Sequence, residues 1–190
     1  MIQLRHPLPA RIFHWTLAPL AITLVATGLY LTNPPYHGSP RTARKLHSLA
    51  GFLFTGGFVA RLYYAALRRE WRLILPERHD LKKLPSFARY HLYLTDKKPQ
   101  FRKYNIGQKF LYTFWPLEAI FALPLGFFLY APHTFARPVK WLGGLARIRQ
   151  LLYSLTLLTA ATMAGHIYLA LTDSVGKLKS IFTGYYKRGT

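Results

Sequence analysis

Four long apolar stretches, separated by polar segments, dominate the pattern of hydrophobic positions along the chain. Each is about 20 residues long, which is the length of helix that crosses the ~30 Å hydrocarbon core of a bilayer. The pattern predicts a single all-α domain over residues 1–190, built as a four-helix transmembrane bundle. The predicted spans cover residues 12–31, 46–66, 110–131 and 151–172.

Basic residues are unevenly shared between the two sides of these spans. The N-terminal segment, the loop between the second and third spans and the C-terminal segment together carry 18 Lys and Arg, whereas the first and third loops carry 7. Because Lys and Arg are enriched on the cytoplasmic side, both termini and this basic loop are expected in the cytoplasm. The sequence therefore predicts a multi-pass protein of the cell inner (cytoplasmic) membrane.

The net charge of +20 and the absence of cysteine narrow the classes of function. In a soluble protein such a charge would indicate nucleic-acid binding. Here charged and apolar residues are segregated along the chain, which favours membrane lipid over nucleic acid as the partner. Without cysteine the chain forms no disulfide, no thiolate zinc site and no iron–sulfur cluster of its own. A redox centre must use other ligands, and eight histidines are available.

The basic loop contains a stretch, residues 81–94, that mixes basic side chains with Leu84, Phe87, Tyr90 and Tyr93. This composition is compatible with a short interfacial helix attracted to anionic lipid. A solvated basic loop is an equally good interpretation of the same residues.

Two histidines from different spans lie at similar depths in the predicted bundle. His14 lies near the cytoplasmic start of the first span, and His166 lies roughly 9 Å from the cytoplasmic end of the fourth. Each ring could simply bond a neighbouring helix or lie at the interface. A depth-matched pair of imidazoles can instead ligate one iron axially and hold a porphyrin between two helices. His14 and His166 are therefore candidate ligands of a haem b.

Three further residues are candidates for roles around such a haem. His47, at the outer start of the second span, can ligate a second haem, with Gly51 on the same helix face to let a flat macrocycle approach. Arg61, near the cytoplasmic end of that span, can pair with a haem propionate or snorkel to the interface. Glu118, about 12 Å into the third span, can relay protons or bond another helix.

Four short motifs carry a resemblance to a known family. They are RIFHW (11–15), RKLHSLAGF (44–52), KYNIGQK (103–109) and GHIYLA (165–170). In this order and spacing they resemble the b-type cytochrome (gamma) subunits of membrane-bound formate dehydrogenases and nickel–iron hydrogenases. The resemblance covers nearly the whole chain and implies an electron-transfer subunit that binds haem and reacts with quinone.

The resemblance implies two haems, one near each membrane face. His14 and His166 match the ligands of the cytoplasmic-side haem, and His47 matches one ligand of the outer haem. The other outer ligand would fall at Leu152, which cannot bind iron. The sequence therefore departs from the family pattern at the outer haem.

Because of that departure, the sequence does not decide whether an outer haem is present. The position of the missing ligand lies fourteen residues, or roughly 21 Å of helix, from His166, too far for efficient single-step electron tunnelling. Either the outer haem is absent, or His37 or His133 replaces the ligand, or a partner subunit supplies a ligand or a nearby redox centre. Ordinary surface residues are the simpler interpretation of His37 and His133. One haem b is expected, with a second left open.

By the same resemblance, the KYNIGQK motif forms part of a pocket for membrane quinone, either menaquinone or ubiquinone. Asn105 and Gln108 would supply its polar groups, Gly107 would allow close approach, and His166 would neighbour the quinone as well as the iron. Amides can donate hydrogen bonds to a quinone oxygen, and histidine can relay protons. The alternative is that Asn105 and Gln108 cap the helix that begins there.

The leading hypothesis is an electron-transfer subunit that anchors a respiratory oxidoreductase in the membrane. It would exchange electrons between quinone and an iron–sulfur subunit, while a separate catalytic subunit acts on the substrate. This chain carries no motif for substrate catalysis. The alternative, motivated by Leu152, is a haem-free membrane anchor or assembly subunit of such a complex.

Overall fold

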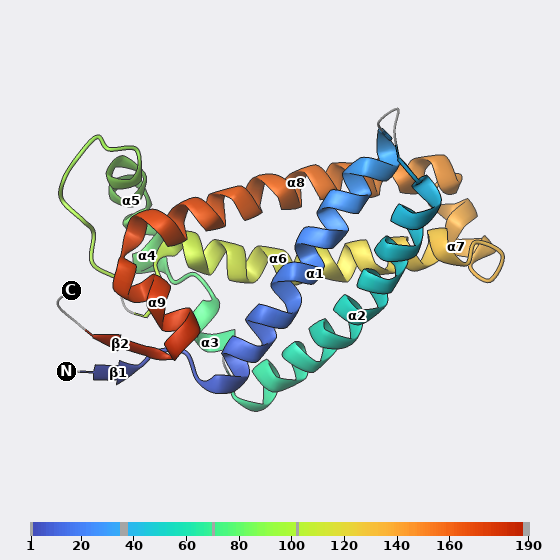
Figure 1. Ribbon diagram of the computed structural model, residues 1–190. Helices are drawn as coiled ribbons and strands as arrows, with labels where there is room; N and C mark the ends of the chain where they lie inside the picture. Colours follow the sequence, from blue (N-terminus) through green and yellow to red (C-terminus); the bar gives the residue numbers. More distant parts are fainter. Residues whose placement is uncertain (1, 35–37, 70, 102, 188–190) are drawn as a thin grey trace. The chain divides into compact units, whose positions relative to one another are not determined.

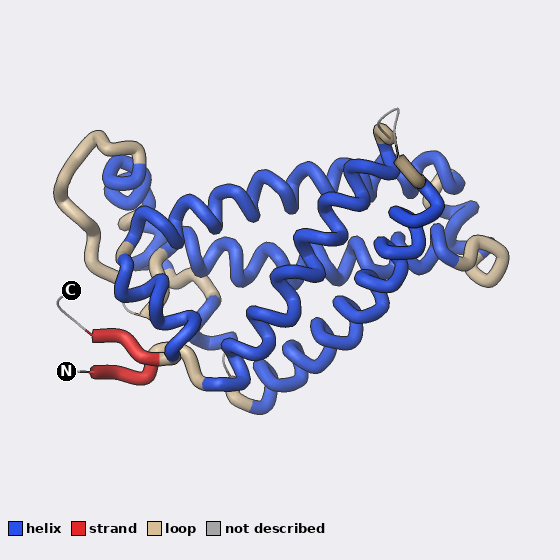
Figure 2. The backbone as a smooth tube through the Cα atoms, in the orientation of Figure 1, coloured by secondary structure: helices blue, strands red, loops and turns tan. Residues whose placement is uncertain are grey.

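The computed structural model describes residues 2–34, 38–69, 71–101 and 103–187. Over these residues the chain is mainly helical, with one short strand near each end (Figures 1 and 2). The long helices are α1 (Leu8–Thr32), α2 (Pro40–Leu67), α6 (Ile106–Tyr130) and α8 (Gly144–Asp173). The shorter elements are β1 (Ile2–Leu4), α3 (Trp71–Ile74), α4 (Arg78–Lys82), α5 (Leu84–His91), α7 (Ala136–Trp141), α9 (Val175–Thr183) and β2 (Tyr185–Lys187).

The four long helices confirm the predicted all-α class and the four apolar spans. Each contains one predicted span, except that Ala131 follows the end of α6. Each is at least 25 residues long and apolar enough to cross a membrane. Large apolar side chains are exposed along them, for example Leu53, Phe121 and Leu171. Exposed apolar surface of this extent is typical of helices that meet lipid, and the chain is a multi-pass membrane protein.

Prolines inside two of the long helices do not interrupt them. α1 continues through Pro19, and α6 continues through Pro116 and Pro124. A proline in a helix removes one backbone N–H donor and is tolerated in membrane helices when neighbouring groups compensate.

The chain divides into two compact units. The first combines Met1–Arg61 with Ala119–Thr190, and the second is Leu62–Glu118. Within the first unit α1 packs along α8, and α7 and α9 also pack against α8 (Figure 1). This unit therefore carries the helices on which His14, His47 and His166 lie.

Small and aromatic residues bring the other helices of the first unit together. A Cβ at Gly57 of α2 would lie 2.9 Å from Leu17 of α1, so the two helices approach closely at this glycine. Phe52 of α2 packs against Phe127 and Tyr130 of α6, with ring centroids 5.7 and 5.1 Å away. Close approach at small residues is a common way for membrane helices to associate.

The two ends of the chain form a small antiparallel sheet in the same unit. Ile2 pairs with Lys187, and Leu4 pairs with Tyr185. Gly184 makes the turn before β2 with a φ of 89°, and a Cβ there would lie 3.0 Å from the His6 carbonyl. The left-handed conformation and the close approach both favour glycine at this position.

The second unit contains α3, α4, α5 and the start of α6. Within residues 81–94 the helix α5 is present, so a short helix is confirmed in this part of the basic loop. Its place at the membrane interface stays a prediction. Lys83 donates a hydrogen bond to the Gln100 carbonyl at 2.8 Å, and Phe87 packs on Phe101 with ring centroids 5.9 Å apart. The segment after α5 therefore folds back onto that helix.

Candidate functional site

The structure brings the predicted pair His14 and His166 together from α1 and α8. Their ring centroids are 6.4 Å apart, and the ring planes are inclined at 47°. A transition metal binds an imidazole nitrogen at about 2 Å, and the ring centre lies roughly 1.2 Å beyond it, so two axial imidazoles have centres about 6 Å apart. The observed spacing fits two axial ligands of one iron.

An unsatisfied nitrogen at His14 also fits a metal-binding role. Its Nδ1 is buried and makes no hydrogen bond to any residue that the structure describes. Buried polar atoms usually find a partner, and an exception calls for an explanation such as a bound ion. Imidazole nitrogen is a common axial donor to haem iron. The chemistry of this donor pair therefore fits haem.

His47 of α2 lies against α1, where a threonine holds its ring. The His47 Nδ1 lies 2.7 Å from the Thr27 hydroxyl oxygen, and that hydroxyl donates its hydrogen to the Thr23 carbonyl at 2.6 Å. With the hydroxyl hydrogen on the Thr23 carbonyl, the Thr27 oxygen is free to accept a hydrogen from His47 Nδ1. This tautomer leaves Nε2 as the nitrogen with a lone pair, as metal-binding histidines require.

The α8 surface near His47 carries the hydroxyl group of Thr156 and not the second ligand of the family pattern. A Cβ at Gly28 of α1 would contact both the His47 ring, at 3.6 Å, and Thr156 of α8, at 3.5 Å. Thr156 donates to the carbonyl of Leu152, the position of the missing ligand. His133 lies in an exposed turn after α6, and His37 lies outside the described residues. His47 is therefore oriented like a ligand, while Leu152 contributes none.

Arg61 lies close to the helical turn that carries His14. Its guanidinium carbon is 5.9 Å from the centroid of the Phe13 ring, within the range of a cation–π interaction. Both predicted roles, pairing with a propionate and snorkelling to the interface, are compatible with this position. Glu118 is buried, with 7 % of its surface exposed, in keeping with a carboxyl group placed inside a span.

The KYNIGQK motif forms the N-terminal cap of α6 in the second unit. The Asn105 side-chain oxygen accepts the Gln108 N–H at 2.8 Å, and the Gln108 side-chain oxygen accepts the Asn105 N–H at 3.1 Å. This reciprocal arrangement is a capping box, so the capping alternative is confirmed for both residues. The cap occupies the side-chain oxygens and not the amino groups, which are the donors that a quinone oxygen requires. Gly107 lies in the first turn of α6.

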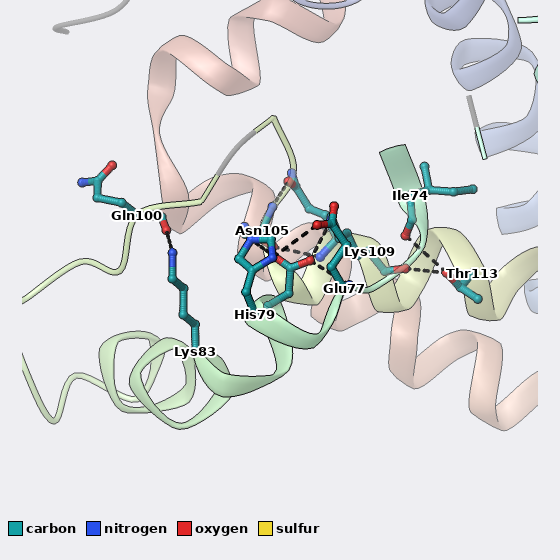
Figure 3. A network of polar contacts seen from close by, with 10 residues as sticks. Ile74, Glu77, His79, Lys83, Gln100, Asn105, Lys109 and Thr113 are labelled. Atoms are coloured by element: carbon teal, nitrogen blue, oxygen red, sulfur yellow. Dashed lines mark hydrogen bonds and ion pairs between the residues drawn. The ribbon is translucent and has the colours of Figure 1, made fainter. Parts of the chain in front are cut away.

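A buried ion pair beside this cap was not predicted. Lys109 Nζ lies 2.7 Å from Asp80 Oδ2, with 4 % and 2 % of the side chains exposed (Figure 3). His79 contacts both acidic neighbours, at 3.2 Å to Asp80 and 3.3 Å to Glu77. The ligand atoms of the three residues lie within 4.8 Å of one another, but the ammonium already compensates Asp80. The pair joins α4 to the first turn of α6.

Burial acts to raise the pKa of the Asp80 carboxyl, but other effects outweigh it. The hydrogen bond from Lys109, the backbone N–H of Glu77 and the nearby charges of Lys109 and His79 hold this pKa below its ordinary value. A depressed carboxyl pKa means that the ionised form stabilises the fold.

We expect the contact between α4 and α6 to weaken in acid. Because the pKa of Asp80 is lower in the folded chain, its contribution is complete above the ordinary carboxyl pKa of about 4 and is lost as the pH falls through the lower folded value. Amide exchange of residues 71–83, corrected for the intrinsic pH dependence, should therefore accelerate as the pH is lowered below about 4. The Asp80→Asn variant should lack this pH-dependent component. Equal protection at neutral pH and in acid in the unmodified protein would contradict the expectation.

Comparison with known proteins agrees with the sequence motifs. A family model described as prokaryotic cytochrome b561 matches residues 5–184. The formate dehydrogenase cytochrome b556 subunit of Haemophilus influenzae is 29 % identical over 192 residues, covering 96 % of this chain and 76 % of that protein. The probable Ni/Fe-hydrogenase B-type cytochrome subunits of Azotobacter vinelandii and Azotobacter chroococcum are each 30 % identical over 138 residues, covering 65 % of this chain and 57 % of those proteins.

Proposed function

The chain belongs to the prokaryotic cytochrome b561 family, and on that premise we propose that it is the membrane-anchoring cytochrome b subunit of a respiratory oxidoreductase. It passes electrons between an iron–sulfur subunit of the partner complex and membrane quinone, menaquinone or ubiquinone. A catalytic subunit of the formate dehydrogenase or hydrogenase type acts on the substrate, by analogy with the complexes for which the chain's relatives are named.

The His14–His166 pair is the observation that carries this proposal. Family membership implies haem b, which supplies one-electron transfer when bound. His14 and His166 would hold its iron, because their ring spacing of 6.4 Å suits two axial imidazoles. Arg61, beside the same turn of α1, would meet a propionate. These residues lie in the first compact unit, so one folded body carries the whole ligand set.

We propose a single haem per chain. The His47 ring contacts Thr27 through Nδ1, which leaves Nε2 for a metal, but Leu152 stands at the position where the family pattern places the second ligand. A second haem would need a ligand from elsewhere, from another histidine or a partner subunit.

Haem quantitation per polypeptide tests both the function and the haem number. The purified protein should show the α-band of a b-type cytochrome in a reduced-minus-oxidised spectrum, with about one haem per chain, since two axial imidazoles hold one iron. A ratio near two would refute the single-haem proposal and leave the electron-transfer function standing. Complete absence of an α-band would favour a haem-free membrane anchor or assembly subunit instead.

The quinone site is proposed at the N-terminal turn of α6. The basic loop and both termini lie on the cytoplasmic side in this proposal, because most Lys and Arg flank the spans there. Asn105 and Gln108 would donate from their amino groups, which the capping box does not use, and Gly107 would allow the ring to approach.

Replacing Gln108 by Glu is expected to separate capping from quinone binding. A glutamate at this position keeps the oxygen that accepts the Asn105 N–H, and therefore keeps the capping box, but its carboxylate has no N–H to donate. Loss of one neutral hydrogen bond, worth about 1 kcal/mol, should raise the KM for quinone about fivefold. Haem content should stay unchanged.

The matched control is Gln150→Glu on α8, where the side-chain oxygen accepts from Arg147 at 3.0 Å. This exchange keeps that acceptor and should leave the KM for quinone unaltered. A wild-type KM in Gln108→Glu would count against Gln108 as a quinone ligand.

A further inference from the structure

Two side chains at the start of α1 hold the end of α9. The Trp15 indole Nε1 donates to the Ile181 carbonyl at 3.2 Å, and Arg11, one turn earlier, donates from Nη1 to the Phe182 carbonyl. The last four carbonyls of a helix have no partner within the helix, and a cation near them is favoured by the helix dipole. Arg11 and Trp15 therefore satisfy carbonyls that α9 itself leaves open.

This contact links the two helices that carry the candidate haem ligands. α9 follows α8 with only Ser174 between them. Beyond α9, Gly184 closes the helix through its N–H to the Ser180 carbonyl at 2.8 Å, and its own carbonyl accepts from Arg5 and His6. The chain ends thus tie α1 to the segment that continues directly from α8.

The Trp15 indole contacts two aromatic rings, those of Phe182 and His14. Its centroid lies 4.7 Å from the Phe182 ring and 4.9 Å from the His14 imidazole, with planes inclined at 33° and 75°. Adjacent residues on a helix do not normally face one another, so the contact between Trp15 and His14 is specific to these side-chain orientations. An edge-to-face contact is directional, and rotation of the imidazole would disrupt it.

His14 lacks the hydrogen bond that normally orients a metal-binding imidazole. Such a ring almost always donates its second N–H to an oxygen atom, and this fixes its rotation. The His47 ring has an oxygen partner in Thr27. Neither ring nitrogen of His14 has a hydrogen bond among the described residues, the buried Nδ1 included, so whichever nitrogen binds the iron, the other has no oxygen partner. The rotation of the His14 ring must therefore be set by packing, and Trp15 is in direct contact with it.

We infer that Trp15, anchored by the Ile181 carbonyl, is a positioning residue that fixes the plane of the His14 imidazole. This role rests on the proposed function, in which His14 and His166 are axial ligands of one haem. Trp15 acts on the iron only through the ring of His14. The anchoring bond to α9 makes the indole a fixed surface rather than a mobile one.

A membrane-interface role for Trp15 is the competing explanation. The indole is 46 % exposed, and tryptophan is enriched where helices enter the headgroup region. In that role Trp15 would set the depth of α1 and leave the plane of His14 unaffected. The two explanations differ in one observable, the angle between the two axial rings.

Electron paramagnetic resonance of the oxidised, purified full-length protein measures that angle. In a low-spin ferric haem with two imidazole ligands, the largest g value depends on the angle between the ring planes. Trp15→Phe keeps an aromatic ring beside His14 but removes the bond to Ile181, and Trp15→Leu removes both. We expect the low-field line to broaden in Trp15→Phe and to shift in Trp15→Leu, with unchanged haem per polypeptide in Trp15→Phe.

Trp141→Phe is the matched control, because Trp141 lies on α7 with 86 % of its surface exposed. Its low-field line should coincide with that of the unmodified protein. An unchanged position and width in both Trp15 variants would overturn the inference.

Two further outcomes are also decisive. If Trp15→Leu loses its haem, the test rests on the low-field line of Trp15→Phe. A broadened line supports the positioning role of Trp15, and an unchanged line refutes it. Unmodified protein that purifies without haem would refute the proposed function itself. An unchanged line in haem-loaded variants would refute only the positioning role.

Discussion

His166→Ala is expected to abolish the b-type α-band, and His14→Ala is expected to do the same. Each replacement removes one of the two proposed iron ligands, whose ring centroids lie 6.4 Å apart. Changes to groups that merely orient a metal ligand cost about 10–100-fold in metal affinity, so loss of the ligand itself should lower haem content by more than about tenfold. The measurement is haem per polypeptide, with a reduced-minus-oxidised spectrum of each purified variant.

Replacements at other histidines provide the controls for this result. His133→Ala alters an exposed turn and should leave the spectrum unchanged. His47→Ala should also retain the α-band if a single haem is held by His14 and His166. Normal haem content in either His14→Ala or His166→Ala would show that the assignment of ligands is wrong.

A cavity variant distinguishes lost ligation from a lost fold. His166→Gly leaves space for a free imidazole where the side chain was, and added imidazole should restore the α-band if the variant is otherwise folded. Failure of rescue, with intact helical content, would indicate that His166 does more than ligate iron. The absence of any effect of His166→Gly before rescue would contradict ligation outright.

The membrane spans and the His14–His166 pair could be predicted because both depend on local sequence. A span is a continuous run of apolar residues, and the position of a histidine within that run gives its depth. About 20 consecutive apolar residues specify a membrane helix whatever surrounds them, and rise per residue gives each side chain a depth. Similar depth and the family resemblance both pair His14 with His166, and the structure places their rings next to one another. Depth does not give side-chain rotamers, so the contact between the adjacent side chains of Trp15 and His14 could not be foreseen.

The sheet formed by β1 and β2 could not be predicted from the sequence, for a different reason. β1 and β2 are three residues each and lie at opposite ends of the sequence. So short a segment has no usable alternation of polar and apolar positions. Its stability comes from a partner about 180 residues away, and from hydrogen bonds to backbone atoms, which carry no side-chain signature. Gly184, with its φ of 89°, is the one local signal at this turn.

Only a weak feature of the sequence indicates the ion pair between Lys109 and Asp80. Glu77 and Asp80 are two of only six acidic residues in the chain, and they lie three residues apart within its most basic loop. Two acidic residues three positions apart among so many cations suggest a specific partner. Which of the twelve basic residues in that loop and its flanks is the partner depends on tertiary contact, and only the structure identifies Lys109.

Replacing Lys109 by Met is expected to release α4 from the start of α6. Removal of one partner from a buried ion pair leaves an uncompensated charge and typically costs about 3–5 kcal/mol. Asp80, with 2 % of its surface exposed, would be that charge. Amide hydrogens of residues 71–83 should then exchange at least about a hundredfold faster, since 1.4 kcal/mol corresponds to a tenfold change. Peptide-resolved hydrogen–deuterium exchange at neutral pH is the measurement.

The double variant Asp80→Asn, Lys109→Met separates pairing from simple loss of packing. With both charges removed, the desolvation cost disappears together with the attraction, and such replacements are often close to neutral. Protection of residues 71–83 should therefore recover most of the way, giving a coupling free energy of about 2–4 kcal/mol between the two sites. If the double variant exchanges as fast as Lys109→Met, the lysine stabilises α4 through its hydrocarbon stem and not through its charge. A rate equal to that of the unmodified protein in Lys109→Met alone would mean that water reaches Asp80, contrary to its burial.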